Sequence, residues 1–267
     1  MMVVDRIVNN LFHSDIEICR LEFQSEHDRV TYYEIIAIKW SSQLETFVRH
    51  GENVGDLFAF IRSKRMPSSE IFVLLNKPDY AREMISKRFG YKKIVNGPPR
   101  LCPERVYGLG RETEARERYQ QLTGNKVRQY RHFVNLKFPW MLATPDGIVV
   151  HNGQLVAGLE IKSPKKNSYQ TMYACMGQVR RNSAGQWYLT SDGPIYAQIQ
   201  MCMAAANLKN WHLAVNFLDE LIVIHVAFDR QFCEDLLARA SKFYTSTYLP
   251  AISYYYWMYQ LYQKTIK

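Results

Sequence analysis

The feature that most constrains the fold is the pair Asn152-Gly153, which stands between two apolar, β-branched runs at 147–150 and 155–161. Asn-Gly accepts the positive φ angles of a two-residue type I′ turn, and that turn matches the twist of paired antiparallel strands. The sequence therefore predicts a β-hairpin here. A hairpin of this length returns the chain, so that the end of the second run lies beside the start of the first.

Patterning elsewhere predicts an α/β protein. Helices are expected at 54–61, at 104–123 with Gly124 as C-cap, at 195–207 and at 229–244. A second hairpin is expected from 211–217 and 221–227, and a long loop at 163–193. Periodicity leaves 18–23 and 31–40 open between strand and short helix. The order of elements indicates helices around one mixed sheet.

Prolines and serines supply three further local predictions. Ser68 or Ser69 is expected to N-cap a helix that carries the apolar residues 71–75. Pro78 is expected to stop or restart that helix. Pro250 is expected to break the chain before a final aromatic helix, whose rings we assign to a subunit or domain contact rather than to stacking on single-stranded bases.

Charge and cysteine content narrow the function class. The net charge is +9 and the pI is about 9.2, which favours an anionic partner such as nucleic acid. The five cysteines form no CxxC pair and no zinc-type cluster with histidine, as expected in a reducing compartment. No apolar run is long enough to cross a membrane, and no secretory leader is recognisable, so we expect an intracellular protein, with nucleus or cytoplasm undecided.

The candidate chemistry lies on the first hairpin. Asp146 precedes its first strand, and Glu160 and Lys162 alternate with Ile161 on the second, so both charged side chains face one side of the sheet. Two carboxylates suit Mg²⁺, which assists phosphodiester hydrolysis, and a nearby lysine can serve the attacking water. Spacing alone leaves open a second interpretation, because an acid followed by Glu-x-Lys also occurs as solvated charge on a strand face.

Several blocks of residues, in the correct order, resemble the lambda-exonuclease-like (YqaJ viral recombinase, alkaline nuclease) family of the PD-(D/E)xK nuclease superfamily. The resemblance runs from about residue 62 to residue 250. The blocks are RSKRMPSSEI at 62–71, GLGRETEAR at 108–116, TPDG at 144–147, EIKSP at 160–164 and YAQIQMCM at 196–203, followed by Asp229, Phe232 and Phe243-Tyr244.

This resemblance implies a restriction-endonuclease-like core, a central mixed sheet flanked by helices. It implies a nuclease domain at 56–267 after an N-terminal extension of unknown role at 1–55. The family's pattern makes Asp146, Glu160 and Glu112 ligands of Mg²⁺, with Mn²⁺ as a substitute. It also implies that Lys162 serves the water that attacks the phosphate. Glu114 is the neighbouring competitor of Glu112. A solvated ion pair with Arg116 is the alternative for Glu112.

Further site residues follow from the same resemblance. Gln198 would line the site, with Tyr196 and Gln200 nearby, although the two glutamines cannot share one face of a helix. Arg62 and Ser69 match positions that hold a terminal phosphate in the family, and Thr144 would also donate to phosphate. A guanidinium with a hydroxyl at a helix start is a chemically sensible anion site.

The implied function is a Mg²⁺-dependent exonuclease, 5′→3′ on linear double-stranded DNA with free ends, in recombination, repair or viral genome processing. The resemblance also implies a ring-shaped homo-oligomer and a single-strand-annealing or recombination protein as partner. Three alternatives stay open: a structure- or sequence-specific endonuclease on the same core, a catalytically idle DNA-binding relative, and a nuclease acting on RNA.

Overall fold

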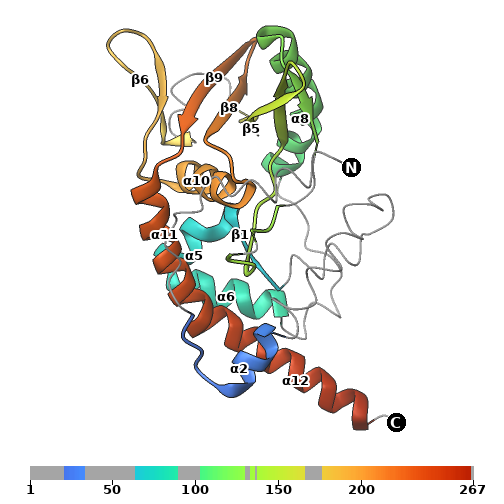
Figure 1. Cartoon of the computed structure of the whole chain (residues 1–267). Helices are drawn as coiled ribbons and strands as arrows, with labels where there is room; N and C mark the ends of the chain where they lie inside the picture. The colour runs from blue at the N-terminus through green and yellow to red at the C-terminus, as the bar shows by residue number, and fades with distance from the viewer. Residues whose placement is uncertain are drawn as a thin grey trace.

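A computed structural model of the chain describes residues 21–33, 64–89, 103–129, 133–135, 137–165 and 176–265. One β-sheet stands over a layer of helices, and a long C-terminal helical segment runs diagonally beneath that layer (Figure 1). The helix expected at 54–61 lies outside the described residues, as does the boundary between 55 and 56, so both stay predictions.

The sheet has five described strands in the order β2-β4-β5-β8-β9. Their bounds are β2 Lys126–Arg128, β4 Gly147–His151, β5 Gln154–Lys162, β8 Asn210–Phe217 and β9 Glu220–Ala227. β5 and β8 are parallel, and the other neighbours are antiparallel. The predicted mixed sheet is thereby confirmed. Its one parallel pair requires a crossover, which includes α10 (Pro194–Ala206).

Both predicted hairpins are present. In the β4–β5 hairpin Asn152 and Gly153 have φ angles of 48° and 79°, the left-handed pair that a type I′ turn requires. A register shift between Val149 and Val150 adds a bulge to this hairpin. The β8–β9 hairpin pairs from Asn210↔Ala227 to Phe217↔Glu220.

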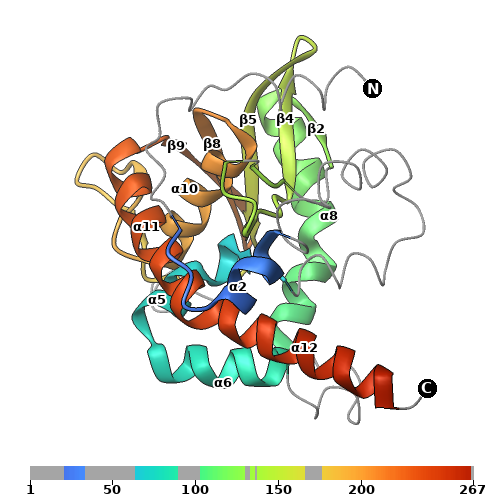
Figure 2. The same cartoon turned by 60° about the horizontal axis from the view of Figure 1, so that its bottom comes forward.

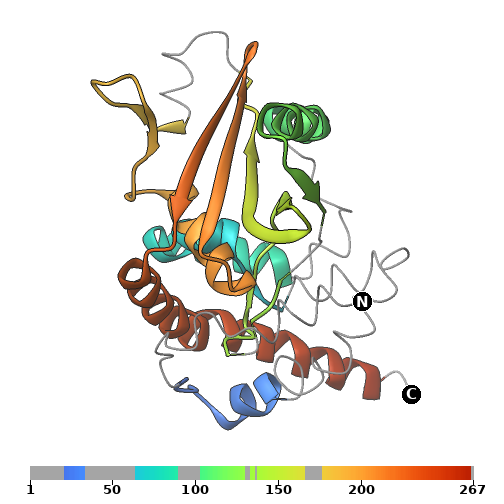
Figure 3. The same cartoon turned by 45° about the horizontal axis from the view of Figure 1, so that its top comes forward.

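The two faces of the sheet are covered by different helices. The predicted long helix is α8 (Pro103–Thr123), and Gly124 follows it with a φ of +69°. Ala115 and Tyr119 of α8 pack on alternate residues of β5, Ala157, Leu159 and Ile161. Figure 3 looks nearly along α8, and Figure 2 shows it running beside β2 and β4.

The opposite face of the sheet forms the larger core. Trp211, Leu213 and Val215 of β8 belong to the same buried cluster as the α10 residues Ile199 and Met203. Below α10 lie α5 (Ile71–Asn76) and α6 (Pro78–Phe89), with α11 (Arg230–Phe243) along the side. Because strand side chains alternate, Glu160 and Lys162 point to this α10 side while Ile161 points to α8.

The serine N-cap prediction is wrong. The chain first forms a short strand, β1 (Met66–Pro67), paired with β3 (Met141–Leu142), and then a 3₁₀ turn, η2 (Ser68–Glu70). No side chain caps either η2 or α5. Ser68 is buried in the core instead, so its hydroxyl is used there and not at a helix start. Pro78 does begin a new helix, α6, as expected.

The expected break at Pro250 is also wrong. α11 continues through a π-helical turn, η3 (Tyr244–Tyr248), into α12 (Leu249–Thr265). Pro250 lies in the first turn of α12, and the wide turn before it uses an i→i−5 bond from Leu249 N–H to the Tyr244 carbonyl. A missing N–H is tolerated in a first helical turn. The final helix is therefore continuous with α11.

The segment 163–193 is not all loop. Within its described part, β6 (Val179–Arg181) and β7 (Trp187–Leu189) form a third, small hairpin beside β9 (Figure 1). The three-residue strands are too short for a periodicity signal in the sequence. Residues 166–175 lie outside the described part.

The described part of the N-terminal extension packs on the C-terminal helix. α2 (Glu26–Thr31) is capped by Ser25, whose hydroxyl accepts from Asp28 N–H at 3.1 Å. His27 lies edge-on to Trp257 of α12, with ring centroids 5.2 Å apart. Trp257 thus makes a contact within the chain. None of the described helices has both the length and the apolar character needed to cross a bilayer.

We expect Gly158→Ala to destabilise the fold strongly. A Cβ at Gly158 of β5 would lie 2.1 Å from the ring of Trp211 on the paired strand β8. Moving a fully buried indole disturbs the larger core, so the free energy of unfolding should fall by about 3 kcal/mol in chemical denaturation. Gly110→Ala, where a Cβ meets nothing within 4 Å, is the matched control and should raise that free energy by up to about 1 kcal/mol. Equal effects of both changes would contradict this account.

We expect stability to fall below neutral pH because of His212. Burial, and then repulsion from His225, lowers the pKa of His212 from 6.5 to about 4, and Tyr119 hydroxyl bonds its Nδ1. The unfolded chain therefore takes up this proton first, so stability is lost as pH falls from about 6.5 to about 4. The loss should be on the order of 2–3 kcal/mol. His212→Asn should flatten the pH profile of the melting temperature over this window, whereas the exposed-residue control His151→Asn should not.

Candidate active site

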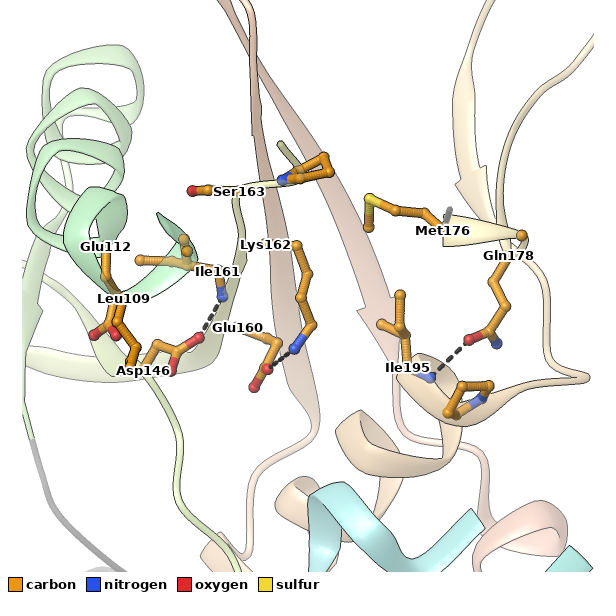
Figure 4. Close-up of a pocket in the computed structure, with 14 residues that line it drawn as sticks. Leu109, Glu112, Asp146, Glu160, Ile161, Lys162, Ser163, Met176, Gln178 and Ile195 are labelled. Carbon is orange, nitrogen blue, oxygen red and sulfur yellow. Dashed lines mark hydrogen bonds and ion pairs between the residues drawn. The ribbon is translucent and has the colours of Figure 1, made fainter. Parts of the chain in front are cut away.

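The β4–β5 hairpin places Asp146 beside the end of β5. Asp146 N–H donates to the Leu159 carbonyl at 3.1 Å, and its Oδ2 accepts from Ile161 N–H at 2.6 Å. Its side chain is therefore fixed by the neighbouring strand. Glu160 and Lys162 leave β5 on the other side of Ile161 and point toward the same space (Figure 4).

Glu160 is the centre of the polar contacts. It is only 2% exposed, and its Oε1 accepts from Lys162 Nζ at 2.5 Å and from Gln198 Nε2 of α10 at 2.7 Å. Its Oε2 is buried and has no hydrogen-bond partner among the described residues. A buried carboxylate oxygen without a donor is costly, and a bound cation would satisfy it.

Burial and mutual repulsion shape the ionisation of this group. Burial, and then the charge of Glu160, raises the pKa of Asp146 well above its usual range, against the opposing effects of Lys162 and the Ile161 N–H. For Lys162, burial acts to lower the pKa, but the charges of Glu160 and Asp146 outweigh it and the pKa is raised. Lys162 is consequently a cation between two acids.

A cavity of about 580 Å³ opens on these three side chains. One wall comes from α8 and the other from residues 176–178 and the start of α10 (Figure 4). The lining residues are Gly108, Leu109, Glu112, Asp146, Glu160, Ile161, Lys162, Ser163, Pro164, Met176, Gly177, Gln178, Pro194 and Ile195. This size is ordinary for a small-ligand site.

Glu112 reaches this cavity from α8, and it also makes the ion pair that the sequence offered as the alternative. Arg116 donates to Glu112 Oε1 at 2.5 Å, one helical turn away. The same side chain lines the cavity while it is paired with Arg116, so the ion pair does not remove it from the site. The competitor Glu114 instead pairs with Arg111 at 2.5 Å on the exposed side of α8. Metal ligation by Glu112 stays a prediction.

The two glutamines of α10 have separate tasks. Gln198 donates to Glu160. Gln200 instead forms two hydrogen bonds with backbone groups: its Nε2 donates to the Ala227 carbonyl at 2.8 Å, and its Oε1 accepts from Asp229 N–H at 2.9 Å. Gln200 thus joins α10 to the end of β9. The hydroxyl of Tyr196 donates to Asp229 Oδ2 at 3.1 Å, and not to the active-site carboxylates Asp146 and Glu160.

The expected phosphate-binding residues are only partly placed. Arg62 lies outside the described residues. Ser69 is exposed on η2, and Thr144 is half-buried two residues before Asp146. Ser68, not Ser69, faces α10, with its Oγ 3.3 Å from Cys202 Sγ. Phosphate binding by Arg62, Ser69 and Thr144 stays a prediction.

Sequence reasoning missed two residues of the site. Cys202 lies one turn beyond Gln198, and burial, then the charge of Glu160, raises the pKa of its thiol. The i, i+4 spacing from Gln198 was the available signal. Gln178 lines the cavity from the unpredicted β6–β7 hairpin, and no local pattern marks it. Among the described residues no three His, Cys, Asp or Glu side chains form a ready metal cage.

Comparison with known proteins gives a family match and several structures of similar fold. A model of the YqaJ-like viral recombinase domain matches residues 60–207. The alkaline exonuclease LHK-Exo from Laribacter hongkongensis is similar in structure, with 15% identity, a TM-score of 0.58, and coverage of 79% of this chain and 99% of that one. The structure of its complex with dAMP has 16% identity to this chain and a TM-score of 0.57. It covers 78% of this chain and 97% of that one.

A phage-related exonuclease from Haemophilus somnus 129PT gives 8% identity, a TM-score of 0.51, and coverage of 71% and 95%. At these identities the similarity is one of fold, and it agrees with the predicted α/β core, a mixed sheet flanked by helices. No curated protein sequence matches the chain.

We expect Asp146→Asn to stabilise the metal-free protein at pH 8. The amide keeps an acceptor for Ile161 N–H but removes the repulsion from Glu160. The free energy of unfolding should rise by about 1 kcal/mol, as when charges crowded at a functional site are relieved. A carboxyl whose pKa is raised on folding begins to destabilise the fold as pH rises past its unfolded value and does so fully above the raised value, so the gain should vanish only in acid. Glu117→Gln on exposed α8 is the control. A loss of stability at pH 8 would contradict the electrostatic account.

Proposed function

The chain belongs to the YqaJ-like viral recombinase domain family, and on this premise we propose that it is a divalent-metal-dependent deoxyribonuclease. The observation that carries the proposal is the carboxylate pair Asp146 and Glu160, held with Lys162 at one end of a hairpin and open to one cavity. Phosphodiester hydrolysis needs oxygen ligands for a metal and a positive charge beside the phosphate, and these residues offer both.

The residues fit Mg²⁺. The unpartnered Oε2 of Glu160 and the carboxylate of Asp146 are hard oxygen donors, and Mg²⁺ is usually held by one or two carboxylates while it keeps several waters. Two carboxylates therefore suffice, although the described residues form no three-residue cage. Glu112 would add its charge from α8, on the side of the cavity where Asp146 lies (Figure 4). When bound, the metal supplies Lewis-acid polarisation of the phosphoryl group and lowers the pKa of bound water.

The chain's own residues supply positioning and charge. Lys162 Nζ, held by Glu160 and lining the cavity, can donate to the attacking water or to a phosphate oxygen and offset the developing negative charge. Gln198 fixes Glu160 from α10, so that the free oxygen of this carboxylate keeps its direction. Asp146 is fixed in the same way by Ile161 N–H. These contacts pre-organise the site before substrate binds.

We propose an exonuclease acting 5′→3′ on linear duplex DNA with free ends. Support comes from the family, from similarity of fold to proteins described as exonucleases, and from the basic balance of the chain. The cavity can accept one nucleotide unit, and a nucleotide, dAMP, is bound in a complex of the Laribacter enzyme. The ring-shaped oligomer and the recombination partner stay predictions from the resemblance.

The test is digestion of linear duplex DNA labelled at either end, compared with closed circular DNA, with Mg²⁺ and with chelator. We expect loss from 5′ ends that chelator abolishes. Lys162→Ala should reduce the rate by about 10²–10³-fold. Lys126→Ala, which removes an exposed lysine from β2 near the other end of the hairpin, should leave the rate unchanged.

Three outcomes would redirect the proposal. Cutting of the closed circle would indicate an endonuclease on the same core. Release of label from 3′ ends would reverse the polarity. Metal-independent cutting, or no cutting of DNA by protein that binds it, would overturn the metal-dependent deoxyribonuclease itself.

A further inference from the structure

The β6–β7 hairpin presents one polar, aromatic face to solvent. Its strands pair Val179 with Leu189, Arg180 with Tyr188, and Arg181 with Trp187. Since side chains alternate along a strand, Arg180 and Tyr188 share one face, and the other two pairs share the opposite face. Arg180 and Tyr188 are both exposed, Tyr188 at 44%. This outer face has no role in the proposed chemistry.

The inner face of the hairpin is used internally. Val179 is buried and packs with Leu189 in the larger core. Arg181 stacks over Trp187 at 5.5 Å and donates from Nε to the Gly185 carbonyl at 2.8 Å. Asn182 and Gln186 bond each other across the turn through both backbone and side chain. These contacts within the hairpin hold its two strands together, so the side chains of its outer face are presented on a well-defined backbone.

The base of the hairpin is part of the active-site cavity. Gln178, which lines the cavity and is 6% exposed, donates from Nε2 to the Thr190 carbonyl at 3.1 Å and accepts at Oε1 from Ile195 N–H at 2.6 Å. A Cβ at Gly193 would lie 2.4 Å from the Gln178 side chain, so this junction is closely packed. One side chain therefore joins the hairpin to α10, the helix that carries Gln198.

The charge of Arg180 acts on one described acid, Asp192, whose pKa is lowered first by the hydrogen bond from Thr190 and also by Arg180. No ion pair within 4 Å joins Arg180 to another side chain in the part of the chain that the structure describes. The nearby acid Asp192 accepts from Thr190 Oγ1 at 2.6 Å. Across the strand pair, the side chains of directly opposed residues start about 5 Å apart. A cation and an aromatic ring therefore stand side by side, and Arg180 follows two residues after Gln178, which lines the cavity.

We propose that this outer face, Arg180 with Tyr188, binds the single-stranded DNA that adjoins the nucleotide in the cavity. Tyr188 stacks on a base and Arg180 pairs with a phosphate. Aromatic rings interleaved with cations bind single strands without regard to sequence, because every base has a π-face and every nucleotide a phosphate. A base inside a duplex is already stacked, so a single strand is the form this face fits. The inference rests on the proposed nuclease function.

The test measures binding of labelled oligothymidylates by fluorescence anisotropy, on a Lys162→Ala parent so that the probe is not consumed. A probe of about 3 nucleotides fills the cavity only, and one of about 12 nucleotides also reaches the hairpin. We expect the longer probe to bind the parent more tightly. Tyr188→Ala should weaken the longer probe about 5- to 100-fold and leave the shorter one unchanged.

Conservative variants separate the two contacts. Tyr188→Phe keeps the ring and should bind the longer probe like the parent. Arg180→Ala should lower the slope of log affinity against log salt by about 0.7, the value for one phosphate of a single strand, and Arg180→Lys should restore it. The matched control is Lys77→Ala with Tyr80→Ala, an exposed cation and tyrosine at the start of α6, on the other side of the molecule (Figure 1). This pair should change neither affinity nor slope.

Failure of this proposal and failure of the nuclease proposal are distinguishable. If the wild type digests DNA but the hairpin variants bind the longer probe like the parent, the hairpin proposal is overturned alone. The same holds if the variants lose affinity only for duplex DNA, or equally for both probe lengths. If the variants behave as expected but the wild type cuts no DNA, the nuclease proposal fails and single-strand binding stands. Unchanged melting temperatures show that the variants remain folded.

Discussion

Two carboxylates that repel each other, Asp146 and Glu160, are held together in a largely buried place, and much of the structure serves to hold them there. Hydrogen bonds from Ile161 N–H, Lys162 Nζ and Gln198 Nε2 fix their directions. These donors come from β5 and α10, which belong to different stretches of the chain. The fold accepts an electrostatic cost at this point, as proteins commonly do where a ligand is to be bound. The position of α10 against the sheet is therefore the constraint that the site depends on.

Sheet topology sets that position. β5 and β8 are parallel, and the crossover between them brings α10 under the face that carries Glu160 and Lys162. Trp211 of β8 covers Gly158 of β5, where any larger residue would collide with the indole. Gln200 ties the other side of α10 to the end of β9. Hydrogen bonds thus join α10 both to β5 and to the end of β9, and Gln198 contacts Glu160 without any movement of the helix.

The sequence was informative where local physics decides the structure. The Asn152-Gly153 turn, the helix ended by Gly124, and the β8–β9 hairpin were predicted and are confirmed. The errors arose where tertiary packing outweighs propensity, as for the β6–β7 hairpin, braced by Gln178, and Pro250, accommodated by a π turn. Within the site, alternation along β5 predicted the facing of Glu160 and Lys162, but Cys202 and Gln178 depend on contacts distant in sequence. Cys202 is marked only by its i, i+4 spacing from Gln198, and no local pattern marks Gln178.

The continuous helix of α11, η3 and α12 also bears on how the protein folds. Tyr248 hydroxyl donates to the Arg65 carbonyl at 3.0 Å and Tyr244 to the Lys64 carbonyl at 3.1 Å, across 183 and 180 residues of chain. During synthesis these tyrosines emerge long after the segment that they hold, and long after both strands of the first hairpin. Contacts between residues so far apart in sequence slow folding, because the entropy cost of closing the loop comes before the contacts stabilise the structure. The segment around Lys64 and Arg65 can therefore reach its final contacts only after the last helices have been synthesised.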